Sequence, residues 1–169
     1  IINSNNALYF IRHGECLSNI GEVVNDQAYD ILTENGKNQA ITCSETLKHI
    51  FNGKEIRFYT SKMTRAIQTG EIITDILNTN ISKSDDRLNE ISHCFRDKEN
   101  GELSYTNVFG RIDEVIAEIW NFSKNRINII ITHQGVLELL ICRVISEYYT
   151  GIELPTRHSN SANFEFHAN

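Results

Sequence analysis

The stretch LYFIRHGECLSN, residues 8–19, carries four apolar or aromatic residues directly into an arginine, a histidine and a glycine. An unbroken apolar run is typical of a strand that is buried on both faces, and Gly14 is suited to a turn behind it. We therefore predict a buried strand over residues 7–12 that delivers Arg12 and His13 to its carboxyl end. Taken alone, the stretch predicts a small anion site there.

Working outward from this strand, strand and helix patterns alternate along the chain. Apolar residues spaced by three and four predict helices over residues 33–50 and 62–78, around residues 112–119, and from Gly135 onward. Short apolar or alternating runs predict strands over residues 56–60, 81–85, 127–132 and 162–167. The buried stripe predicted for the first helix is Ala40, Cys43, Leu47 and Ile50. Residues 91–110 contain two glycines and no sustained period, so we predict a long loop with some local helix.

This alternation predicts a mostly parallel sheet covered by helices on both faces, with residues 162–167 as an edge strand. In such folds ligands bind beyond the carboxyl ends of the strands. Three predicted strand ends carry polar side chains to that edge, in the segments RHGE (12–15), TSKMTR (60–65) and THQG (132–135).

Composition narrows the possible functions. The chain has 169 residues, of which 40% are hydrophobic and 22% charged, as expected for one globular domain. A net charge of -6 without a block of Lys or Arg argues against a nucleic-acid partner. No apolar run approaches the roughly 20 residues of a membrane span. Four scattered cysteines without Cys-x-x-Cys spacing indicate reduced thiols and a cytoplasmic protein.

Two histidines and two arginines at one sheet edge form a cationic site in an acidic protein. The guanidinium fork matches two phosphate oxygens at once, so Arg12 and Arg65 are suited to a phosphate. The backbone amides of Gln134 or Gly135, at the start of a helix, also favour an anion.

His13, between an arginine and a glycine, is placed to attack phosphorus and form a covalent intermediate. We expect no metal or other cofactor, because arginines can offset the charge of the transferring group and no acidic cluster has metal-ligand spacing. One carboxylic acid must still protonate the leaving oxygen and later activate water. The candidates are Glu15, Glu90, Asp97, Glu99 and Glu102.

Together these motifs resemble the histidine phosphatase superfamily, also called the phosphoglycerate mutase-like family. The resemblance follows the order of the chain through RHGECLSN, LTENGKNQA, SKMTRAIQT, RLNE and THQG. It implies an α/β fold, a three-layer α/β/α sandwich with a mostly parallel central sheet and one antiparallel edge strand, in a single domain over residues 1–169. It also implies a phosphohistidine mechanism with these roles: His13 the nucleophile, Glu90 the general acid and base, Arg12, Arg65 and His133 holding phosphoryl oxygens, and Asn19 an added donor.

The resemblance has two departures from the usual family pattern. ISHCFRD follows RLNE, where many members have a glycine and then Trp-Glu-Gly or a similar continuation, and Gln134 stands where a glycine is common. The Gln134 backbone amide would still serve a phosphate.

The predicted function is a metal-independent phosphomonoester phosphatase that acts on a small phosphorylated metabolite. The alternatives are a cofactor-dependent phosphoglycerate mutase and a non-catalytic phosphate-binding regulatory module. Residues 91–126 lack the adjacent arginine pair expected of a mutase, which favours the phosphatase. The complete set of motif residues argues against the regulatory module.

Overall fold

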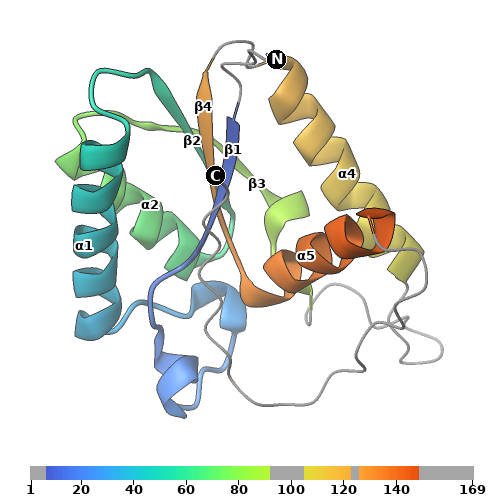
Figure 1. The fold of residues 1–169 in the computed structure, drawn as a ribbon. Helices are drawn as coiled ribbons and strands as arrows, with labels where there is room; N and C mark the ends of the chain where they lie inside the picture. The colour runs from blue at the N-terminus through green and yellow to red at the C-terminus, as the bar shows by residue number, and fades with distance from the viewer. Residues whose placement is uncertain (1–6, 92–104, 123–125, 149–169) are drawn as a thin grey trace.

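The computed structural model describes residues 7–91, 105–122 and 126–148, and within these ranges four strands form one parallel sheet. The strands are β1 (Ala7–Arg12), β2 (Ile56–Ser61), β3 (Ile81–Asp85) and β4 (Ile127–Thr132). Their order across the sheet is β1-β4-β2-β3 (Figure 1). The larger helices are α1 (Glu34–Ile50), α2 (Thr64–Ile76), α4 (Tyr105–Phe122) and α5 (Gln134–Tyr148). Short 3-10 helices occur at η1 (Leu17–Ile20), η2 (Gln27–Tyr29) and η3 (Asp86–Leu88).

The sheet is the middle layer of a three-layer α/β/α sandwich, as predicted. Helices α1 and α2 lie on one side of it and α4 and α5 on the other (Figure 1). Alternation along β4 shows why both faces are covered: Ile129 and Ile131 pack in the core under α1 and α2, whereas Ile130 packs in the core under α4. The antiparallel edge strand predicted over residues 162–167 lies outside the described residues.

The first strand packs on both of its faces, as predicted, but it is only partly buried: Leu8 and Phe10 contact one hydrophobic cluster and Ile11 contacts the other. Within the described sheet β1 lies at an edge, Arg12 is exposed, and Tyr9 is 37% exposed with its ring against Phe51. The strands with neighbours on both sides are β4 and β2, and every residue of β4 is buried. The apolar run in β1 is therefore explained by contacts on its faces and not by a central position.

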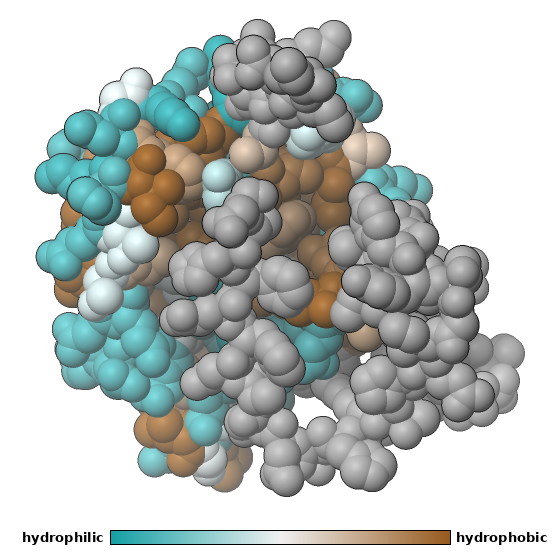
Figure 2. Space-filling model, viewed as in Figure 1, coloured by the Kyte–Doolittle hydropathy of each residue, from teal (hydrophilic) through white to brown (hydrophobic). Residues whose placement is uncertain are grey.

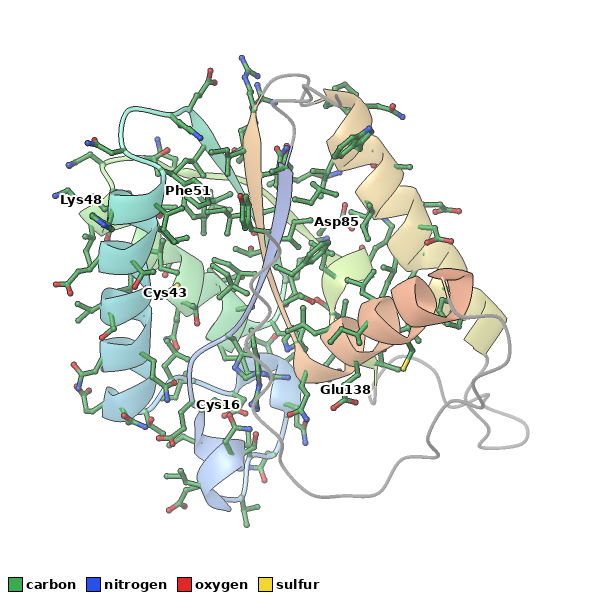
Figure 3. The ribbon with its side chains drawn as sticks, viewed as in Figure 1. Cys16, Cys43, Lys48, Phe51, Asp85 and Glu138 are labelled. Carbon is green, nitrogen blue, oxygen red and sulfur yellow. The ribbon has the colours of Figure 1, made fainter. Side chains whose placement is uncertain are left out.

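Helix α1 begins with a side-chain cap and buries a stripe that differs from the predicted one. The Thr33 hydroxyl accepts a hydrogen bond from the amide of Gly36 at 3.0 Å. The buried residues of α1 are Gly36, Ala40, Ser44 and Leu47. Ile50, which we predicted to be buried, is 53% exposed, and Phe51 packs between the end of α1 and the sheet instead (Figure 3). The outer side of α1 is mainly hydrophilic (Figure 2).

Helix α4 begins at Tyr105, inside the loop predicted over residues 91–110. Phe109, Ile112 and Ile116 continue one apolar stripe at spacings of three and four, and they pack against α5. We treated Gly110 as a sign of a loop, but an exposed helical glycine costs only about 1 kcal/mol relative to alanine. Packing against α5 outweighs that cost, so residues 105–110 form the local helix that the prediction allowed and continue into the rest of α4.

No helix in the described parts of the chain is long and apolar enough to cross a membrane. The cytoplasmic location stays a prediction.

Candidate active site

The register between β1 and β4 brings the two motif histidines together. Arg12 stands opposite Thr132, and the amide of His13 donates to the Thr132 carbonyl at 3.0 Å. His13 and His133 therefore follow their strands at the same level, with ring centroids 5.0 Å apart. Both side chains are buried. The predicted meeting of these strand ends is confirmed.

His13 is held as a neutral ring with one defined tautomer. Its Nδ1 lies 2.7 Å from the carbonyl oxygen of Gly14, and Nε of Arg65 donates to its Nε2 at 3.0 Å. Because a guanidinium can only donate, Nε2 is the accepting nitrogen and Nδ1 carries the proton. Burial, with the nearby charges of Arg65 and Arg12, lowers the pKa of His13 to about 3 despite the opposing hydrogen bond to Gly14. At neutral pH the ring therefore has a lone pair on Nε2.

Arg65, in the first turn of α2, is buried, and several groups orient it, including the sulfur of Met63, which accepts from Nη2 at 3.4 Å. Besides its bond to His13, it donates through Nη1 to the carbonyl of Gln27 at 2.8 Å. The Asp30 carboxylate lies 4.0 Å from the same nitrogen. A fixed guanidinium of this kind suits the planar, two-point binding of phosphoryl oxygens.

Asp30 was not identified from the sequence, and the structure makes it the buried counter-charge of Arg65. Its side chain is fully buried, and the Ser18 hydroxyl donates to it at 2.6 Å. Burial alone would raise the pKa of Asp30, but hydrogen bonds from Ser18 and Cys16 and the charge of Arg65 lower it overall. The carboxylate is therefore ionised at neutral pH.

His133 is the second buried neutral histidine of the site. Its Nε2 lies 2.6 Å from Oγ of Ser61, the last residue of β2. Burial, followed by the neighbouring His13 and the charges of Arg65 and other arginines, lowers the pKa of His133 to about 2. Ser61 belongs to the SKMTR segment, but sequence reasoning assigned it no role.

Glu90 lies against the start of α5, the helix that begins at Gln134, directly after His133. Its Oε1 accepts hydrogen bonds from the amides of Gly135 at 3.2 Å and Ile91 at 2.8 Å. A side chain at Gly135 would collide with that oxygen, so the glycine permits the approach. The Gly135 amide, which we predicted as an anion donor, is thus occupied by Glu90. Gln134 donates through its side chain to Glu138 at 2.7 Å.

Arg12 and Asn19 lie at the exposed side of the site. Arg12 directly precedes His13 at the end of β1, and its charge contributes to the lowered pKa of both histidines. Asn19 accepts through Oδ1 from the amide and the thiol of Cys16, each at 3.1 Å. In Figure 3, Cys16 and Glu138 mark this carboxyl end of the sheet. The phosphate contacts of Arg12 and Asn19 stay predictions.

The other carboxylate candidates are structural or lie outside the described residues. Glu15 accepts from the Thr33 hydroxyl at 2.6 Å and from Asn35 at 3.1 Å, so it secures the start of α1. Asp97, Glu99 and Glu102 lie outside the described residues. Over the described ranges, no three His, Cys, Asp or Glu side chains are grouped so that they could hold a metal ion.

Comparison with known families identifies the architecture around these residues. A sequence profile of the histidine phosphatase superfamily, branch 1, matches residues 8–94. The chain belongs to this superfamily. The matched region contains His13, Arg65 and Glu90, whereas His133 lies beyond it and is brought to the site by the fold. No curated protein sequence matches the chain at a significant level.

Solved structures share this histidine phosphatase fold. One is an Escherichia coli protein provisionally identified as an alpha-ribazole-5′-P phosphatase, with 26% identity, a TM-score of 0.63 and coverage of 82% of this chain and 79% of that one. Bacillus stearothermophilus YhfR has 23% identity, a TM-score of 0.66 and coverage of 82% and 79%. A Plasmodium falciparum phosphoglycerate mutase has 22% identity, a TM-score of 0.54 and coverage of 83% and 69%. Below 25% identity the likeness supports the fold alone.

The family and the fold together identify this histidine phosphatase as an enzyme, a phosphatase of the hydrolase class.

Proposed function

We propose that the protein is a metal-independent phosphomonoesterase that acts on a small phosphorylated metabolite through a phosphohistidine at His13. The observation that carries the proposal is the defined lone pair on Nε2 of His13, next to the buried guanidinium of Arg65. A neutral histidine with an unprotonated nitrogen is a nucleophile, and a neighbouring cation stabilises the charge of the group it attacks.

In the first step, Nε2 of His13 attacks phosphorus. The N–P bond forms while the P–O bond to the substrate alcohol breaks, and Glu90 donates a proton to the leaving oxygen. Oε1 of Glu90 already accepts from two amides, whereas Oε2 has only a 3.5 Å contact to Gly135. Oε2 is therefore the oxygen better placed to carry that proton.

In the second step, water replaces His13 on phosphorus. Glu90, now a carboxylate, takes a proton from the water, whose oxygen bonds to phosphorus as the N–P bond breaks. Inorganic phosphate leaves, and both His13 and Glu90 regain their starting protonation. Both transfers are easier than direct hydrolysis, because an oriented side chain is the nucleophile in the first and Glu90 activates the water in the second.

Arg65 has two roles in this reaction. Without substrate, its Nε donates to the lone pair that must attack. A phosphoryl oxygen binds a guanidinium more strongly than a neutral imidazole nitrogen does, because the hydrogen bond then joins two charged groups. Substrate binding would draw this donor from His13 to the phosphate and release the nucleophile as it is needed.

The test is phosphate release from a panel of phosphorylated metabolites and an aryl phosphate, with a metal chelator present. We expect turnover by the wild type and none by His13→Ala. His49→Ala, which removes an exposed histidine of α1, is the matched control and should retain activity. Substantial turnover by His13→Ala would overturn the nucleophile assignment, and a wild type that needs added metal would overturn metal independence.

Assays on the same purified protein distinguish the phosphatase from a mutase and from a regulatory module. A mutase would convert 3-phosphoglycerate to its isomer faster than it releases phosphate. A regulatory module would bind inorganic phosphate but turn over no ester in the panel. Either result would replace the phosphatase proposal.

A further inference from the structure

Ser61, the last residue of β2, is a fully buried serine whose hydroxyl meets the ring of His133. Its Oγ lies 2.6 Å from Nε2 of that ring, and it accepts a hydrogen bond from the amide of Met63 at 3.2 Å. Ser61 and His133 are both 0% exposed. The hydroxyl is therefore fixed from two sides, by the turn into α2 and by the histidine.

The hydrogen-bond count assigns the proton between Ser61 and His133. The Met63 amide can only donate, so it uses a lone pair of the hydroxyl oxygen. The hydroxyl proton still needs an acceptor, because a buried donor without a partner is costly. Among its hydrogen-bond partners in the described residues, Nε2 of His133 alone can accept. Ser61 therefore donates to Nε2, and the neutral ring carries its own proton on Nδ1.

This assignment leaves an unusual group in the site. Nδ1 of His133 is buried, and it makes no hydrogen bond to any described residue. The ring that carries this unpaired N–H stands 5.0 Å, between centroids, from the ring of His13. A phosphoryl group on or near His13 would bring an anionic oxygen to just such a donor, and a charge-assisted hydrogen bond would satisfy it.

We propose that Ser61 is a positioning residue that holds His133 in the Nδ1–H form and so presents this N–H to a phosphoryl oxygen. The inference rests on the proposed function and deepens it. In the other tautomer a lone pair on Nδ1 would face the anionic oxygen and repel it. The serine thus decides whether a neutral histidine attracts or repels the phosphoryl group.

Nitrogen NMR of the full chain tests the assignment without any turnover. In a long-range proton–nitrogen spectrum at about pH 7, wild-type His133 should show a protonated Nδ1 and an unprotonated Nε2. Added inorganic phosphate should shift the Nδ1 proton signal. Ser61→Ala should abolish the preference for this tautomer. Ser84→Ala removes a hydroxyl that bonds Thr60 in the same sheet and should leave the His133 signals unchanged. A wild-type His133 protonated on Nε2 would overturn the inference.

Two substitutions of the ring give a second test. An asparagine amide can place its donor where Nδ1 stands, whereas a glutamine amide reaches toward Nε2. We expect kcat/KM of His133→Asn to be about tenfold or more above that of His133→Gln. A ratio of this size corresponds to the free energy of one strong hydrogen bond. Equal or reversed activities would contradict the proposal. If the wild type releases no phosphate at all, the proposed function fails, and the nitrogen spectrum with inorganic phosphate still decides the role of Ser61.

Discussion

Asp30 shows how a residue outside every recognised motif can control the site. It is a fully buried carboxylate whose charge faces Arg65, the arginine that contacts the nucleophile. Asp30→Asn keeps the shape and an oxygen that can accept from Ser18 but removes the charge that orients the guanidinium. We expect kcat/KM to fall about tenfold and unfolding free energy to fall by about 1–3 kcal/mol.

Steady-state kinetics and urea unfolding measure these two changes. The matched control is Asp26→Asn on the same loop, because the Asp26 side chain accepts from the nearby Ala28 amide and asparagine can do the same. If Asp30→Asn behaves like Asp26→Asn in both assays, Asp30 does not position Arg65.

The proposed role of Glu90 as proton donor predicts that the effect of its loss depends on the leaving group. Glu90→Gln keeps an oxygen for the amides of Gly135 and Ile91 but has no proton to donate. Alkyl phosphates, whose leaving oxygens need protonation, should slow by about 100-fold or more, and p-nitrophenyl phosphate by less than about tenfold. Initial rates on both substrates provide the measurement. Glu138→Gln, an exposed acid of α5, is the control, and equal slowing of both substrates would remove Glu90 as the proton donor.

At the scale of elements, α1 meets the loop behind β1 through two glycines. A side chain on Gly14 would collide with the Gly36 carbonyl, and one on Gly36 would collide with the Glu15 carbonyl. Gly36→Ala should destabilise the protein by about 2 kcal/mol or more, since backbone on both sides must move. Gly110→Ala in α4 faces open space and should stabilise by about 0.5–1 kcal/mol. Thermal or urea unfolding compares the two, and a neutral Gly36→Ala would contradict the close packing.

The same elements show what sequence could predict. Apolar period and the three polar strand ends correctly predicted the described strands, the helices and the meeting of His13 with His133. They could not predict which strand is central, because apolar runs look alike in β1 and β4 and only pairing distinguishes them. The start of α4 was missed because one exposed glycine interrupts an otherwise continuous helical stripe.

Within the site, roles could be predicted for residues that belong to a recognisable motif. Roles that depend on long-range contacts could not be predicted. Arg65 could be proposed from its type and place, whereas Glu90 was one of five candidate carboxylates and was selected only by the family resemblance. Asp30 lies outside every motif, and Ser61 lies within one that assigns it no role. Their roles come from partners at residues 65 and 133 that only the folded chain brings near.

At the scale of the whole molecule, the two buried histidines couple stability to pH. The pKa values of His13 and His133 fall from about 6.5 to about 3 and about 2 on folding. Below about pH 6.5 the two histidines therefore bind protons in the unfolded chain but not in the folded chain. The free energy of unfolding consequently falls as the pH falls. Each histidine contributes at most about 1.4 kcal/mol per pH unit in this range.

Urea unfolding between about pH 6.5 and 4.5 tests this coupling, because Asp30, with a lowered carboxyl pKa, loses its contribution only at lower pH. His133→Gln should reduce the slope of unfolding free energy against pH by up to about 1.4 kcal/mol per unit, since the unfolded variant has one histidine fewer to protonate. His49→Gln replaces an exposed histidine and should follow the wild-type curve. A His133→Gln curve parallel to the wild type would mean that His133 takes up its proton in the folded site, which is incompatible with a neutral donor facing the phosphoryl group.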